Sequence, residues 1–171
     1  MKLNVALDAP TDEAFASAMA PLFEGAPRFL ARLAVARPFQ TPDALFERAR
    51  AIAHGMPEDE QVELIDAHPR LGAPPATVSV LSYAEQGYDR PGQPPVDVAV
   101  ELERLNAAYE ARFGFRYCVF VAGRSREALL PDMAAAIDGD RASELHRALD
   151  AVVDIARDRL ATLDRTYEVR T

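Results

Sequence analysis

Apolar side chains recur every three or four positions along most of this chain, and short polar stretches separate the runs. This spacing is typical of helices that bury one face, because one turn takes about 3.6 residues. Capping residues and prolines mark the expected helix starts, which follow Thr11, Pro27, Thr41, Pro57, Asp97 and Ser125. A longer helix is expected over residues 140–163, with its apolar stripe at Leu145, Leu149, Val152, Ala156, Leu160 and Leu163. The pattern predicts an all-α helical bundle.

Two stretches depart from the helical period. Residues 72–95 hold five prolines and three glycines, which predicts a long connector, and we expect this connector to be functional. In residues 115–121, apolar Phe115, Tyr117, Val119 and Val121 alternate with Arg116, Cys118 and Phe120. A period of two predicts an extended segment that passes through the interior. Pro131 is expected to kink or split the helix that follows Ser125.

Composition narrows the class of protein. A chain of 171 residues is most simply a single domain, here residues 1–171, and 49% hydrophobic with 27% charged residues indicates a globular protein. A net charge of −8 argues against nucleic acid as a partner, and no apolar run reaches the roughly eighteen residues of a membrane span. The first eight residues lack the apolar core of a signal peptide. These features predict a cytoplasmic protein.

His68 is the first candidate for chemistry. It lies directly before Pro69, which disfavours a helical conformation at His68, so the residue should end the helix that begins after Pro57. Imidazole moves protons near neutral pH. The alternative is that His68 only caps the carbonyl end of that helix.

Glu85 and Arg159 are the other candidates, and each has a structural alternative. Ser82 and Glu85 are spaced as a capping box, so Glu85 could serve only the helix backbone. Arg159 shares the edge of the apolar face of the last helix, whereas Arg157 should point away from it. The alternative for Arg159 is a stem that covers apolar surface while its head lies in water.

The remaining cysteine and histidines point to no further chemistry. Cys118 is the only cysteine, so an internal disulfide is excluded, and its place in an apolar run predicts a packing residue. His54 and His146 are expected to be structural or exposed to solvent. The three histidines show no metal-ligand spacing with one another or with the cysteine, so we predict no metal site.

Several short motifs, taken in order, resemble the 2-oxo-4-hydroxy-4-carboxy-5-ureidoimidazoline (OHCU) decarboxylases of uric acid breakdown. The motifs cover nearly the whole chain and are found at residues 22–24, 36–39, 64–72, 82–86, 105–109, 112–115 and 155–160. The resemblance implies an all-helical bundle that is often a homodimer. It also implies a carboxy-lyase that needs no cofactor and gives (S)-allantoin from a small anionic ureidoimidazoline.

The resemblance also implies roles for individual residues. His68 would be the general acid and base, Glu85 would orient His68 or bind the ureido group, and Arg159 would hold the substrate anion. Pro69 would fix the loop. Hydrogen bonds to the substrate would come from Ser82, Gln86 and the segment with Phe115, Tyr117, Cys118 and Val119. The chain departs from the family after Gln86, at residues 87–91, and around Pro131.

Two alternatives stay open at this point. The departures allow a paralogous decarboxylase or isomerase that acts on another small ureido acid. A helical interaction module without catalysis is the alternative from another class, in which His68 and Arg159 serve only as cap and packing. An enzyme should line one small pocket with His68, Glu85 and Arg159, whereas a module should show a broad apolar patch. The last residues, 168–171, are not a peroxisomal signal.

Overall fold

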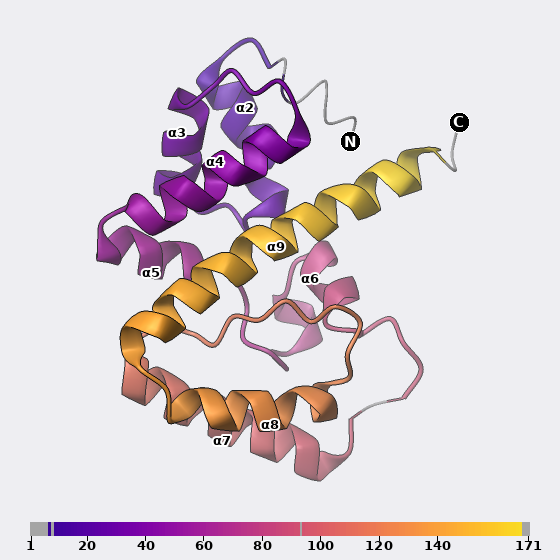
Figure 1. The fold of residues 1–171 in the computed structure, drawn as a ribbon. Coiled ribbons are helices and arrows are strands. Elements are labelled where there is room, and N and C mark those ends of the chain that lie inside the picture. The colour runs from indigo at the N-terminus through magenta and orange to yellow at the C-terminus, as the bar shows by residue number, and fades with distance from the viewer. Residues whose placement is uncertain (1–6, 8, 93, 169–171) are drawn as a thin grey trace. The chain divides into compact units, whose positions relative to one another are not determined.

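The computed structural model describes residues 7, 9–92 and 94–168, with side chains described to residue 163 (Figure 1). In these parts of the chain the regular structure is helical and no β-strand occurs, which confirms the all-α class. The longer helices are α2 (Asp12–Met19), α3 (Pro27–Val35), α4 (Pro42–Gly55), α5 (Glu58–Asp66), α6 (Val80–Glu85), α7 (Val96–Phe113), α8 (Arg126–Ile137) and α9 (Arg141–Glu168). Two short 3-10 helices are η1 (Ala20–Leu22) and η2 (Pro75–Thr77).

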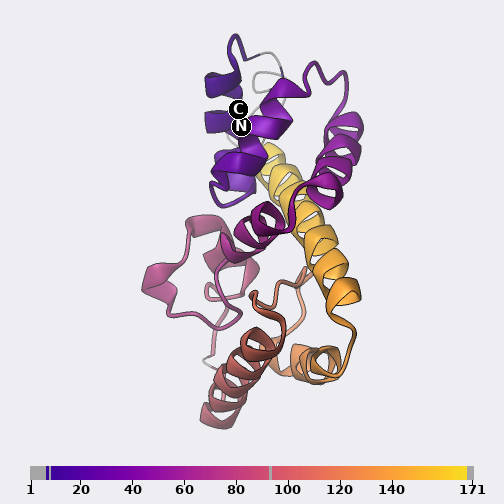
Figure 2. The ribbon, with the colours of Figure 1, turned by 90° about the vertical axis from the view of Figure 1, so that its left-hand side faces the viewer.

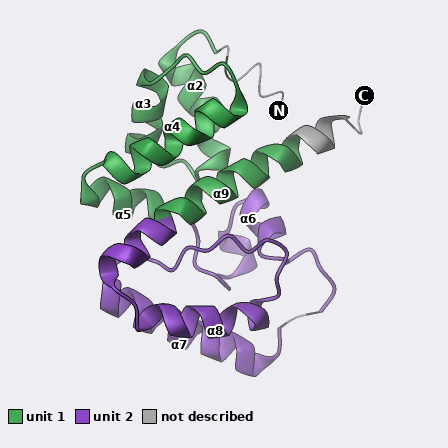
Figure 3. Ribbon diagram, in the orientation of Figure 1, with its two compact units in different colours: residues 1–67, 149–171 green, residues 68–148 purple. Residues whose placement is uncertain are grey.

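The chain forms two compact units (Figure 3). Unit 1 holds residues 1–67 and 149–171, and unit 2 holds residues 68–148. Figures 1 and 2 show α9 as one unbroken helix, whose first turns belong to unit 2 and whose remainder belongs to unit 1. The single domain expected over 1–171 stays a prediction. Among the described helices, none is both long and apolar enough to cross a membrane.

Unit 1 begins with helices whose starts the sequence predicted. The hydroxyl of Thr11 accepts a hydrogen bond from the backbone N–H of Ala14 at 3.1 Å, and Thr41 does the same for Ala44 at 3.1 Å. Each hydroxyl satisfies a donor that the first helical turn leaves unpaired. Apolar side chains of α2 to α5 and of α9 form the core of the unit, among them Phe15, Met19, Phe29, Leu33, Leu45, Leu64, Val152 and Ala156.

A cluster of charges joins α4 to α9 at the surface of unit 1. Arg50 pairs with Asp150 and, at 2.7 Å, with Asp154, while His54 Nε2 lies 2.8 Å from Asp150 Oδ1. Burial would raise the pKa of Asp150, but the hydrogen bonds from His54 and Arg50 outweigh it and hold the pKa below its usual value. The carboxylate is therefore favoured in the folded chain.

Acid should weaken this cluster. Because folding lowers the pKa of Asp150, its contribution to stability is present above the unfolded-state pKa and is lost as the pH falls through the folded-state value. The side chain is 45% exposed, so we expect Asp150→Asn to lower the free energy of unfolding by only about 0.5–1 kcal/mol near neutral pH. Urea unfolding at neutral and at acidic pH tests this. The deficit of the variant should shrink in acid; an unchanged deficit would contradict the prediction.

Unit 2 is built on α7 and α8, which lie side by side in Figures 1 and 2. The N-cap of α8 is Ser125, as predicted, and its hydroxyl accepts from the N–H of Ala128 at 3.2 Å. Of the kink or split expected at Pro131, the split is wrong, since α8 continues through this residue, and the kink stays a prediction. Pro131 is exposed while Leu129 and Met133 are fully buried, so packing of the neighbouring turns offsets the backbone hydrogen bond that proline cannot make.

The two irregular stretches of the sequence both lie in unit 2. The connector expected over residues 72–95 contains η2 and α6 and is otherwise without regular structure where it is described. Residues 116–121 are neither helix nor strand, and the stretch contributes buried Phe115, Tyr117, Cys118 and Val121. Burial of these four side chains confirms that the stretch lies largely in the interior, although Val119 and Phe120 are half-buried. The extended conformation and the packing role of Cys118 stay predictions.

Candidate active site

His68 follows the end of α5 and is almost fully buried, with 4% of its surface exposed. The helix ends at Asp66, and Ala67 closes it with a backbone hydrogen bond to the carbonyl of Glu63. The carbonyl of His68 itself accepts from Arg116 Nη1 at 3.0 Å. This contact connects the histidine to the irregular segment around residues 115–121, within unit 2.

The turn from His68 to Gly72 is held by side chains from two other parts of unit 2. Gln86 uses both ends of its amide, because Nε2 donates to the carbonyl of Arg70 at 3.1 Å and Oε1 accepts from the N–H of Gly72 at 2.8 Å. Asn106 Nδ2 donates to the carbonyl of Leu71 at 3.0 Å. Backbone groups that a turn leaves unpaired are thereby satisfied, so the turn has a defined shape.

Two further features fix the same turn. The guanidinium of Arg70 binds Glu110 through two hydrogen bonds, of 2.7 and 2.6 Å, and contacts Glu103 at 3.2 Å. Gly72 has φ of +80°, and a Cβ there would lie 3.1 Å from Leu102 Cδ1. Both the left-handed backbone and the close approach to α7 favour glycine at this position.

The capping box expected from Ser82 and Glu85 is wrong. The N-cap of α6 is Ser79, whose hydroxyl accepts from the N–H of Ser82 at 3.1 Å. Ser82 is thus inside the helix and is buried, with 2% of its surface exposed, and Glu85 is the last helical residue and is half-buried. Neither side chain serves to start the helix, so the structural alternative for Glu85 does not hold.

Arg159 lies in unit 1 and is buried together with its charge. Only 4% of its side chain is exposed, and Nη1 lies 2.8 Å from Glu24 Oε1. Nη1 also donates to the carbonyl of Pro21 at 3.2 Å and lies 3.4 Å from that of Leu22. The alternative in which the head lies in water is therefore wrong. Arg157 is exposed and pairs with Asp43, as its predicted outward direction requires.

Glu24 is a residue that the sequence analysis missed. Its side chain is 12% exposed, and its backbone has φ of +52°, an uncommon left-handed conformation for a residue other than glycine. The conformation places the carboxylate against the guanidinium of Arg159. Glu24 does fall in one of the family-like motifs, directly after Leu22 and Phe23, and an acidic residue beside two buried apolar residues is the signal that could have found it.

The segment with Phe115, Tyr117, Cys118 and Val119 is anchored by a half-buried arginine of unit 2 and its buried partners. Arg147 Nη1 donates to the carbonyl of Cys118 at 2.9 Å, and Nε donates to Glu144 at 2.9 Å. Tyr109 donates its hydroxyl to the same carboxylate at 2.8 Å. Burial and this hydrogen bond raise the pKa of Tyr109 well above its usual value, so the phenol stays protonated as a donor.

The structure thus connects some of the predicted site residues directly. Gln86 and the turn that begins with His68 and Pro69 are joined within unit 2, which also holds Ser82, Glu85 and the segment at 115–119. Arg159 belongs to unit 1. Asn106 and Arg116, which anchor the turn, were missed. For Asn106, the available signal in the sequence was an asparagine between Leu105 and Tyr109 on the apolar face of a helix, a face that the structure buries. Among the described residues, no cluster of metal ligands occurs.

Comparison with known proteins shows which family and fold this chain resembles. The sequence profile of OHCU decarboxylases matches residues 8–161. The 2-oxo-4-hydroxy-4-carboxy-5-ureidoimidazoline decarboxylase of Haloferax volcanii is 29% identical over 150 residues, which are 88% of this chain and 89% of that protein. The uric acid degradation bifunctional protein PucL of Bacillus subtilis is 31% identical over 142 residues, 83% of this chain but 28% of that protein.

The fold is also shared with a solved structure. The crystal structure of an OHCU decarboxylase in the presence of (S)-allantoin superposes with a TM-score of 0.67 at 21% identity, and the match covers 85% of this chain and 96% of that one. The profile match over most of the chain shows that this protein belongs to the OHCU decarboxylase family.

Proposed function

We propose that this chain is a carboxy-lyase that converts 2-oxo-4-hydroxy-4-carboxy-5-ureidoimidazoline to (S)-allantoin in uric acid degradation. The observation that carries the proposal is the family match over residues 8–161, which includes His68 in its anchored turn. Relatives named for this activity match over most of their length, as the protein of Haloferax volcanii does over 89%.

The proposed reaction needs no outside electron acceptor. The bond between the ring carbon and the carboxylate breaks, carbon dioxide leaves, and the electron pair stays on the ring, which delocalises it. The pair is delocalised onto the neighbouring ring carbon, which bears the ureido group, and this carbon takes a proton on one face, which fixes the (S) configuration. The hydroxyl on the carbon that lost carbon dioxide gives up its proton and becomes the ring carbonyl. The protein has only to orient the substrate, exclude bulk water and move protons, so the proposal includes no cofactor.

His68 is the proposed proton carrier. Imidazole is the side chain whose ordinary pKa lies closest to neutral pH, and burial keeps it away from bulk water. A proton donor must be held at a fixed position to deliver its proton to one face. The hydrogen bonds of Gln86, Asn106 and Arg116 to the turn supply that rigidity, and Pro69 restricts the backbone next to the imidazole.

The other predicted site residues take binding roles in this proposal. Arg159 would hold the substrate carboxylate, because a guanidinium matches a carboxylate with paired donors. Glu85 would orient His68 or bind the ureido group. Hydrogen bonds to the ring and ureido atoms would come from Ser82, Gln86 and the segment with Phe115, Tyr117, Cys118 and Val119. We also infer a cytoplasmic homodimer without a nucleic-acid partner, on the basis of charge, a single cysteine and the family.

A circular dichroism time course tests the proposed function. The unstable substrate is generated from urate by the two preceding activities, and this chain is added or left out. Spontaneous decay gives racemic allantoin without a signal, so the enzyme should produce the (S) signal rapidly. A reaction that stays silent with folded protein would overturn the proposal and favour a paralogue with another ureido acid as substrate.

A further inference from the structure

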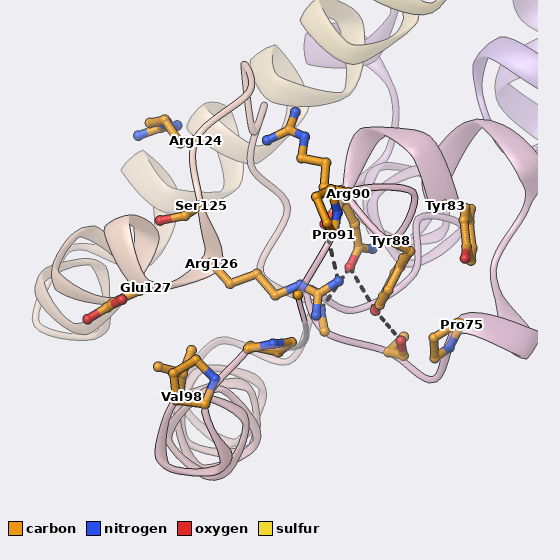
Figure 4. A pocket seen from close by; sticks show the side chains of 17 residues that line it. Pro75, Tyr83, Tyr88, Arg90, Pro91, Val98, Arg124, Ser125, Arg126 and Glu127 are labelled. Atoms are coloured by element: carbon orange, nitrogen blue, oxygen red, sulfur yellow. Dashed lines mark hydrogen bonds between the residues drawn. The ribbon is translucent and has the colours of Figure 1, made fainter.

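Unit 2 contains a pocket that shares Gln86 with the proposed substrate site but is not lined by His68 or Glu85. The pocket has a volume of about 680 Å³ and lies between the proline-rich connector and the start of α8 (Figure 4). Its walls include Pro75, Tyr88 and Pro91 from the connector and Arg126 from α8. This volume is within the range of about 300–1,000 Å³ that is usual for small-molecule sites.

Three arginines line the pocket, and two of them lack an acidic partner. Arg124 has an acidic partner, because its three nitrogens bind the carbonyls of Val121 and Phe120 and the carboxylate of Asp132.

The other two arginines bind only backbone carbonyls. Arg90 donates to the carbonyl of Gly123 at 2.9 Å, and Arg126 donates to that of Gln86 at 3.2 Å. Within the described part of the chain, neither Arg90 nor Arg126 forms an ion pair. Glu127 also lines the pocket, so one carboxylate faces two guanidinium groups without an ion pair, and the pocket keeps a net positive charge although the chain carries a net charge of −8.

Arg126 is held in place by an aromatic ring. Its guanidinium carbon lies 4.0 Å from the centroid of Tyr88, toward which Figure 4 shows the side chain extending, and the Tyr83 ring lies 5.3 Å from that of Tyr88. Arg126 Nε is buried without a hydrogen-bond partner among the described residues. The stacking and the bond to Gln86 fix the plane of the guanidinium, and they use only Nη2 among its terminal donors.

We propose that this pocket binds a small anion whose carboxylate or phosphate is attached to a flat ring. Guanidinium groups match both kinds of oxyanion with paired donors. Tyrosine and proline walls offer flat apolar surface for the ring, which a pocket of this volume accommodates. A concavity with net positive charge also attracts anions from solution.

Isothermal titration calorimetry on the folded 171-residue chain, with no substrate present, tests the proposal. The anionic probes are benzoate and adenosine monophosphate, and benzamide and adenosine are their uncharged counterparts. We expect saturable binding of at least one anionic probe, with the uncharged counterpart at least about tenfold weaker. Arg90→Gln and Arg126→Gln should each weaken the anionic probe about tenfold. The matched control is Arg48→Gln, an exposed arginine of α4 without an ion pair among the described residues.

The outcomes separate the ligand sources and can overturn the proposal. Binding of benzoate alone assigns a ring carboxylate, and binding of adenosine monophosphate alone assigns a phosphate ester. The proposed site is overturned if neither anion binds or if the uncharged probes bind as tightly as the anions. It is also overturned if Arg48→Gln weakens binding as much as the two pocket variants do. Arg90 is exposed, so its variant remains informative if Arg126→Gln does not fold. The titration requires no turnover, so its result does not depend on the proposed decarboxylation.

Discussion

His68→Asn is expected to lower the rate of (S)-allantoin formation by roughly 100- to 10,000-fold, the usual contribution of a positioned acid or base. Asparagine keeps polar atoms of similar size at this buried position but cannot exchange a proton near neutral pH. The substrate would still bind and lose carbon dioxide slowly, while protonation on one face would no longer be directed. In the circular dichroism time course, allantoin should therefore form more slowly, and the (S) signal should be absent because the product is racemic.

The control for this variant is His146→Asn, which changes an exposed histidine of α9. Far-ultraviolet circular dichroism and urea unfolding of both variants should match those of the wild type, so that a loss of activity is not a loss of fold. If His68→Asn keeps the rate and the (S) signal, His68 is not the proton carrier. The alternative in which His68 only caps the carbonyl end of its helix would then stand.

The helical framework could be predicted because its signals are local. Thr11, Thr41 and Ser125 act within three residues of their own positions, and the structure contains each of these caps. Ser79 and Ser82 show the limit of local signals. Both precede plausible first turns, and the choice between them depends on burial of Ser82, which is a tertiary property. Pro131 shows the same limit, since α8 continues through it between the buried residues Leu129 and Met133.

The candidate site could be predicted as a set of residues but not as a set of contacts. His68, Glu85 and Arg159 were found through motifs, whereas their anchors come from distant parts of the chain. Glu24 pairs with Arg159 across most of the sequence, and Asn106 binds a carbonyl 35 positions away. Contacts of this range depend on how helices pack, which periodicity does not encode.

Variants of the buried pair Arg159 and Glu24 can distinguish a role of Arg159 in substrate binding from a role in stabilising the fold. Removing one member leaves a buried charge without its partner, and such a loss costs about 3–5 kcal/mol of unfolding free energy. We expect Arg159→Met and Glu24→Gln each to be destabilised on that scale. The double variant should be more stable than the sum of the two losses predicts, because it buries no unpaired charge. Urea unfolding of the four proteins gives the coupling energy, and Arg157→Met, which breaks an exposed pair, serves as the control.

Activity of the same four proteins then assigns the role of the guanidinium. If Arg159 holds the substrate carboxylate, the double variant should regain stability and still lose about 100-fold or more in kcat/KM, since neither methionine nor glutamine supplies the positive charge. Glu24→Gln retains the guanidinium and should lose less, through its position alone. If the double variant regains stability and activity together, Arg159 has no role beyond packing. The proposed anion contact would then have to come from another residue.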